Sequence, residues 1–76
     1  MMKLPQEFND AILGYGTSLL LEEDVLVYDV ETVLYVLMDE GMSYEDAMEH
    51  FTYNIEGSYV GPGTPIWLWP VRVEDL

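Results

Sequence analysis

His50 is the one imidazole in this 76-residue chain and the residue whose chemistry is easiest to define. If residues 44–56 form a helix, His50 lies one turn after Asp46 and next to Glu49, so it could pair with a carboxylate for acid–base catalysis. A catalytic dyad also needs a nucleophile or a substrate pocket, and the sequence indicates neither. A divalent metal on His50 and Asp46 would have two ligands, which makes a weak site. We therefore expect no enzymatic activity, no metal and no cofactor, and an exposed helical histidine.

Asn54 is the second polar side chain of interest, three residues after Phe51 and close to Gly57. A partly buried amide at a helix end can hydrogen-bond the backbone of the following loop and fix its path. The alternative role is contact with a ligand. We expect the structural role, because buried amides are usually satisfied within the protein.

Charge is the most unusual property of the chain. Fifteen Asp and Glu face two Lys and Arg, which gives a formal net charge of -13. Such a balance repels nucleic acid and anionic membranes and attracts basic protein surfaces. The acidic residues are either an ordinary solvated surface or a binding surface, in its sharpest form a mimic of DNA that would carry carboxylates at phosphate-like spacing.

The carboxylates fall outside the apolar stripes of the expected helices, so they should cover the outer face. With Glu22, Glu23 and Asp24 they would form a continuous negative surface. Glu45, Glu49 and Glu56 should line one side of the second helix, and we predict that they bind a partner. The remaining members of the predicted outer face are Glu31, Asp39, Glu40 and Asp46.

Trp67 and Trp69 are the other predicted partner-binding residues. In a strand they share one face, while Ile66 and Leu68 take the other. A strand that is apolar on both faces is either buried on both sides or part of an interface. Trp is common among interface hot spots, so we expect contact with a host protein or a homodimer through residues 66–69.

Two short amphipathic helices must position these residues. Asp29 can cap a helix over about 30–40, and Gly41 can end it. Ser43, with Asp46 three residues later, opens a second helix over about 44–56 that Gly57 ends. Apolar residues recur at helical spacing in both helices. The two stripes comprise Val30, Val33, Leu34, Leu37 and Met38, then Ala47, Met48, Phe51 and Ile55.

The remaining elements are short. Residues 6–13 suit a short N-terminal helix with Phe8, Ala11 and Ile12 on one side, and Gly14-Tyr15-Gly16 reads as a turn. Residues 25–28 and 66–69 are β-branched or aromatic and read as strands. Pro65 and Pro70 bracket the second strand and favour an edge position. We predict a single small acidic α+β domain over residues 1–76, in which the helical hairpin packs on a two-stranded ribbon.

The ordered motifs of the chain resemble a family of small uncharacterised bacteriophage proteins. In that family a Tyr-Asp precedes a helix, a Gly-Met-Ser/Thr-x-Glu-Glu-Ala turn follows, and a Phe-x-x-Asn-x-x-Gly-Ala-x-x-Gly-x-x-Thr-Pro stretch ends the motif. The resemblance spans residues 11–68, and Ser58 stands where the family often has Ala. The matching positions are Tyr28, Asp29, Gly41, Met42, Ser43, Glu45, Asp46, Ala47, Phe51, Asn54, Gly57, Gly61, Thr64 and Pro65.

The resemblance implies a viral protein but brings no biochemical activity with it. No apolar run approaches the roughly 20 residues that span a bilayer, so we expect no binding to a membrane and a location in the host cytoplasm. The acidic charge predicts that the protein does not bind nucleic acid directly. We predict a non-enzymatic phage accessory protein that modulates a host or phage protein with a basic surface, for example as a DNA mimic or an anti-defence inhibitor. The alternative is a self-associating structural or assembly accessory protein of the phage.

Overall fold

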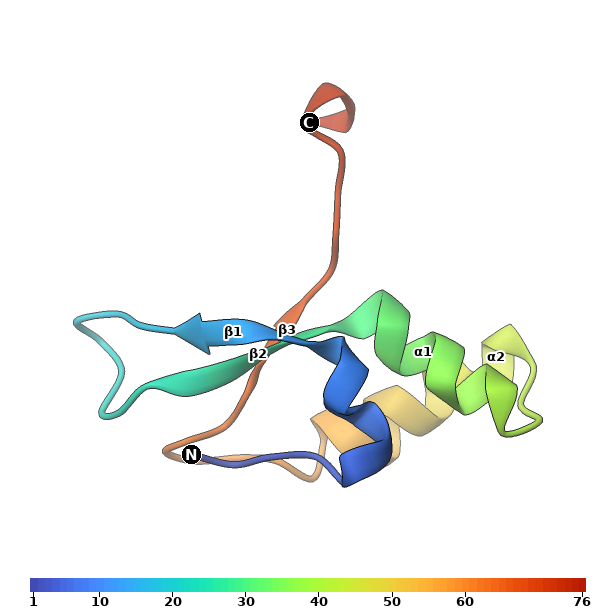
Figure 1. The fold of residues 1–76 in the computed structure, drawn as a ribbon, viewed down its shortest axis with the longest axis horizontal. Coiled ribbons are helices and arrows are strands. Elements are labelled where there is room, and N and C mark those ends of the chain that lie inside the picture. The colour runs from blue at the N-terminus through green and yellow to red at the C-terminus, as the bar shows by residue number, and fades with distance from the viewer.

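In the computed structural model, which describes residues 1–76, the chain is built around a three-stranded sheet in the order β1–β2–β3 (Figure 1). β1 (Ile12–Gly16) runs antiparallel to β2 (Val25–Asp29), and β3 (Ile66–Leu68) runs parallel to β2. The pairing of the two predicted strands is confirmed, as is the edge position of the second. The α+β class is also confirmed, but the sheet has one strand more than the predicted ribbon.

The extra strand is the segment around Gly14 and Gly16, for which the prediction of a turn was wrong. Gly14 lies opposite Val27 and Gly16 opposite Val25, with a register shift between Ile12 and Gly14. A Cβ on Gly16 would lie 2.6 Å from Cδ1 of Ile66, so glycine here leaves room for a side chain from the far edge of the sheet. The N-terminal helix is correspondingly shorter than predicted, a 3-10 helix η1 over Gln6–Ala11.

The helical hairpin begins and ends as its capping residues predict. α1 (Val30–Asp39) is capped by Asp29, whose carboxylate accepts a hydrogen bond from the Glu31 amide. Gly41 follows the helix with a φ of 108°, a conformation that side chains disfavour. α2 (Tyr44–His50) is capped by Ser43, whose hydroxyl accepts a hydrogen bond of 3.1 Å from the Asp46 amide.

The second helix changes its winding at Phe51. It continues to Glu56 as a π-helical segment, η2 (Phe51–Glu56), and the Gly57 amide donates to the carbonyl of Thr52, five residues earlier. The predicted end at Gly57 is confirmed. The apolar spacing of the helix fits both windings, because Ala47, Phe51 and Ile55 lie four residues apart and all three are buried.

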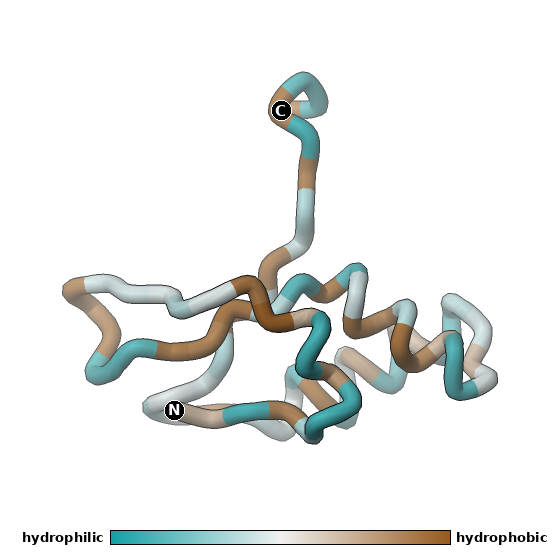
Figure 2. Tube along the Cα trace, in the orientation of Figure 1, coloured by the Kyte–Doolittle hydropathy of each residue, from teal (hydrophilic) through white to brown (hydrophobic).

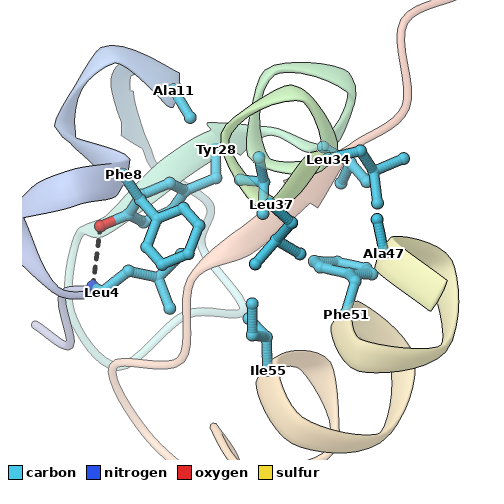
Figure 3. Close-up of a cluster of buried hydrophobic side chains, with 11 residues drawn as sticks. Leu4, Phe8, Ala11, Tyr28, Leu34, Leu37, Ala47, Phe51 and Ile55 are labelled. Atoms are coloured by element: carbon cyan, nitrogen blue, oxygen red, sulfur yellow. Dashed lines mark hydrogen bonds between the residues drawn. The ribbon is translucent and has the colours of Figure 1, made fainter. Parts of the chain in front are cut away.

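The core lies between the sheet and the helices (Figure 3). Tyr28 enters it from β2 and accepts a hydrogen bond from the Leu4 amide at 2.8 Å. Burial raises the pKa of the Tyr28 hydroxyl, and the bond from Leu4 acts in the opposite direction. The predicted stripes supply most of the cluster, which comprises Leu4, Phe8, Ala11, Tyr28, Val30, Val33, Leu34, Leu37, Ala47, Phe51 and Ile55.

Two segments extend away from this core (Figure 1). The turn between β1 and β2 carries apolar residues at its tip (Figure 2), where Leu19 and Leu20 are 104% and 93% exposed. Residues 70–76 run out from the other side and end in a 3-10 turn, η3 (Val73–Asp75). None of the helices combines the length and apolar character needed to cross a bilayer.

Candidate partner-binding surfaces

The predicted acidic residues of the second helix all reach solvent. Glu45 and Glu49 lie on consecutive turns of α2 and are exposed, and Glu56 is exposed at the end of η2. A π turn holds more residues than an α turn, so each residue advances by a smaller angle. Glu56 is therefore rotated away from the line that a regular helix would give it. The structure places Glu45 and Glu49 together and sets Glu56 apart.

The positive groups of the chain leave these carboxylates without a cation. The N-terminal amine pairs with Glu23 at 3.1 Å, Arg72 pairs with Glu74 at 3.9 Å, and Lys3 forms no ion pair. Both acidic partners lie outside α1, α2 and η2. The negative charge of the helical hairpin is thus available to a partner.

The continuous surface expected from Glu22, Glu23 and Asp24 to the helices does not form. These three residues lie in the turn between β1 and β2, at one end of the molecule, whereas α2 lies at the other end (Figure 1). The prediction failed because the β hairpin extends the turn away from the helices. The structure therefore has two separate acidic regions.

A contact between two carboxyl groups shows how densely the helical end is charged. The side chain of Glu7, on η1, lies near that of Glu40, just after α1, and this neighbouring carboxyl group, which can hydrogen-bond the protonated form, raises the pKa of Glu40. Glu40 also lies at the C-terminus of α1, where the helix dipole disfavours negative charge. A cationic partner near Glu40 would reduce both the repulsion from Glu7 and the unfavourable interaction with the helix dipole.

His50 and Asn54 contact each other on the second helix, where His50, predicted to be exposed, is partly buried. Nδ2 of Asn54 lies 3.4 Å from Nδ1 of His50, and Asn54 is exposed. Asn54 does not hydrogen-bond the following loop, so its predicted role was wrong: its side chain is exposed and lies beside that of His50, four residues earlier. The structure holds no group of three or more His, Asp or Glu side chains arranged to bind a metal.

The two tryptophans share the helix-facing side of β3 and its continuation, as predicted. The centroid of the Trp67 ring lies 5.4 Å from the ring centroid of Phe51 and 5.8 Å from that of Tyr28. Trp69 lies 5.9 Å from Phe51 and is 49% exposed. On the opposite face, Ile66 and Leu68 are 40% and 38% exposed. Trp67 is thus a packing residue, while Trp69, Ile66 and Leu68 are open to a partner.

A groove of about 280 Å³ lies between α1, the start of α2 and the chain after β3. Its apolar lining consists of Leu34, Tyr35, Met38, Tyr44, Trp69 and Pro70. Glu31 lines it as well, and the Tyr35 hydroxyl donates to Oε1 of Glu31 at 3.4 Å. Sequence reasoning missed this groove. A partial signal was present, because Glu31, Tyr35 and Met38 recur at helical spacing beside the buried stripe of α1.

We find no match for this chain among models of known protein families, among characterised proteins or among solved structures. The resemblance to small bacteriophage proteins stays a prediction.

Proposed function

We propose that this chain is a non-enzymatic phage accessory protein that binds a host or phage protein with a basic surface and modulates it in the host cytoplasm. The observation that carries the proposal is the cluster of exposed carboxylates on the helical hairpin, none of which pairs with a cation of the chain. Each like-charge contact in such a cluster opposes folding, as Glu7 and Glu40 illustrate. A basic partner turns the same charges into favourable contacts.

Electrostatic attraction gives such a partner fast and salt-dependent association. Glu45 and Glu49 supply the centre of this surface, and Glu56 supplies its margin. Inhibition of a DNA-binding host or defence protein is the specific form of modulation that this charge favours, because a basic DNA groove is a surface complementary to it.

Affinity capture from a host lysate tests the proposal. The triple variant Glu45→Lys, Glu49→Lys, Glu56→Lys should lose the captured protein and keep its fold, because exposed charges contribute little to stability. The matched control Glu22→Lys, Asp24→Lys, Asp75→Lys changes the net charge equally but away from α2, and it should retain capture. Equal loss in both variants would contradict a localised surface.

Salt and DNA provide two further readouts. Capture should weaken steeply from low to physiological salt, since charges are screened over roughly 8–10 Å at that ionic strength. If the partner binds DNA, duplex DNA should compete with this protein for it. Capture that is indifferent to salt and to charge reversal would overturn the proposal.

Self-association is a second candidate, favoured by the exposure of Ile66 and Leu68 on an edge strand. A dimer through residues 66–69 would bury this face, and sedimentation at micromolar concentration would detect it. Ile66→Ser with Leu68→Ser should then give a monomer. Trp67→Ser is unsuitable for this test, because Trp67 packs on Phe51 and its loss would disturb the fold. A wild-type monomer at high concentration would remove this candidate.

A further inference from the structure

The groove beside α1 has the dimensions of a site for one side chain. Its volume of about 280 Å³ lies just below the roughly 300–1,000 Å³ usual for small-molecule sites. Leu34 forms its floor and is 3% exposed, whereas Tyr35 and Tyr44 stand at its walls and are 58% and 56% exposed. The groove is therefore formed by a buried base and aromatic sides that a guest side chain could cover.

The residues that line the groove favour a ligand with a positively charged head and an apolar stem. Three aromatic residues, Tyr35, Tyr44 and Trp69, line the groove, and the face of an aromatic ring attracts a positive group. Glu31 adds a carboxylate, and the hydroxyl of Tyr35 hydrogen-bonds it. Met38 provides a polarizable surface of the kind found at binding sites that adapt to their guest.

Charge complementarity excludes most other occupants. A second copy would bring another -13 to the contact, and nucleic acid or anionic lipid would be repelled in the same way. Arg72, near the groove, pairs with Glu74 and leaves the Glu31 carboxylate unpaired. Among cationic side chains, arginine fits best, because its planar guanidinium is weakly hydrated and stacks on aromatic rings.

We propose that the groove lined by Glu31, Tyr35, Tyr44 and Trp69 binds an arginine side chain of the basic partner protein. This inference rests on the proposed function, because the arginine belongs to the proposed basic partner. Binding in the groove would add short-range contacts to the long-range attraction between the charged surfaces. The aromatic walls enclose the guanidinium, Glu31 neutralises it, and Leu34 and Met38 receive the methylene stem. Aromatic residues and arginine are the usual components of interface hot spots.

NMR titration with n-butylguanidinium tests the groove directly. The probe has the head and stem of an arginine side chain, and n-butylurea is its neutral counterpart of nearly the same shape. The guanidinium should shift the Trp69 indole and Met38 methyl signals and bind at least about threefold more tightly than the urea, as expected for a cation beside aromatic rings. Equal affinity for the two probes, or shifts confined to other signals, would overturn the proposal.

Two variants assign the effect to groove residues. Tyr35→Leu and Glu31→Gln should each weaken guanidinium binding by about threefold or more. Tyr53→Leu and Glu22→Gln are matched controls at exposed residues outside the groove, and both should leave binding unchanged. Tyr35 and Glu31 are exposed, so the variants should fold, and their unfolding curves would verify it. Binding that survives both groove variants would contradict the assignment.

The same variants separate a groove that binds no arginine from a protein that captures no basic partner. If capture of a basic protein depends on Glu45 and Glu49 but is unaffected by Tyr35→Leu and Glu31→Gln, the function stands and the groove is not its anchor. If no basic protein is captured while the guanidinium probe binds as described, the groove stands and the proposed function fails. If sedimentation shows a dimer that Arg72→Gln abolishes, the occupant is a second copy and the inference is overturned.

Discussion

The phenol oxygen of Tyr28, on the central strand, accepts a hydrogen bond of 2.8 Å from the amide of Leu4, which lies 24 residues earlier in the chain. Leu4 and Tyr28 are both buried, at 2% and 0% exposed. This bond joins the N-terminal segment to the sheet on the side of the core where Phe8 lies (Figure 3).

Tyr28→Phe should lower the free energy of unfolding by about 1–3 kcal/mol, because the Leu4 amide would stay buried without an acceptor. Urea unfolding measures the change. Tyr15→Phe, at a residue that is 69% exposed, is the control and should have no effect. An unchanged midpoint in Tyr28→Phe would show that the bond does not hold the N-terminal segment.

Alkaline pH should weaken the fold through the same residue. The pKa of Tyr28 in the folded state is raised above its ordinary value of 10.0, mainly by burial. The unfolded chain therefore loses this proton at a lower pH, so the contribution to stability is complete below pH 10.0 and is lost as the pH rises through the folded-state pKa. Unfolding curves from about pH 8 to about pH 11 should show this loss in the wild type and a smaller one in Tyr28→Phe.

Glu7→Gln should stabilise the protein at neutral pH. The neighbouring Glu7 carboxyl, which can hydrogen-bond protonated Glu40, raises the pKa of Glu40 above 4.5, so the folded state holds this proton more tightly than the unfolded chain does. The stabilising contribution is complete below pH 4.5 and is lost as the pH rises, when the two carboxylates repel each other. The variant should have a higher melting temperature at neutral pH, an advantage that disappears in acid.

Carboxyl NMR titration checks the cause of that effect. In Glu7→Gln the pKa of Glu40 should move back toward its ordinary value, whereas in Glu49→Gln it should stay raised. A Glu40 pKa that is indifferent to Glu7→Gln would refute the contact.

Gly41→Val should lower the free energy of unfolding by about 1–2 kcal/mol, because a β-branched residue is strained at a φ of 108°. No atom lies within 4 Å of a Cβ placed there, so the effect isolates the backbone conformation from packing. Thermal unfolding measures it, and Gly41→Asn should cost less since Asn tolerates positive φ better. Equal stability of Gly41→Val and the wild type would mean that α1 does not end here.

Leu19→Ser with Leu20→Ser should change the free energy of unfolding by no more than about 0.5 kcal/mol, because both side chains are fully exposed at the tip of the β hairpin. Leu34→Ala, in the core, should cost about 2–5 kcal/mol and serves as the contrast. A large loss in the tip variant would show that these leucines pack on the body of the protein.

Local signals in the sequence were enough to predict the helical hairpin. Asp29 and Ser43 cap helices through bonds to residues two and three positions away, and Gly41 acts through its own φ. These effects need no information from distant parts of the chain. The predicted strands at 25–28 and 66–69 were found for a similar reason, because their β-branched and aromatic composition is a local property.

The features that were missed depend on distant contacts. Gly14 and Gly16 belong to a strand because Val25 and Val27 pair with them and Ile66 needs the space above Gly16. The groove combines Tyr35, Tyr44 and Trp69 from three separate segments, so their proximity cannot be read from spacing. The negative surface was predicted as continuous because the sequence does not show how far the β hairpin carries its turn from α2.

The parallel pairing of β2 with β3 places the whole of residues 30–65 between two neighbouring strands. Closing so long a connection costs more chain entropy than forming either the β1–β2 hairpin or the capped helices, which are local. The last strand should therefore join the sheet late in folding and leave it early in partial opening. When it leaves, Trp67 loses its contacts with Tyr28 and Phe51, so the indole of this residue reports on the final step by which the chain closes its own core.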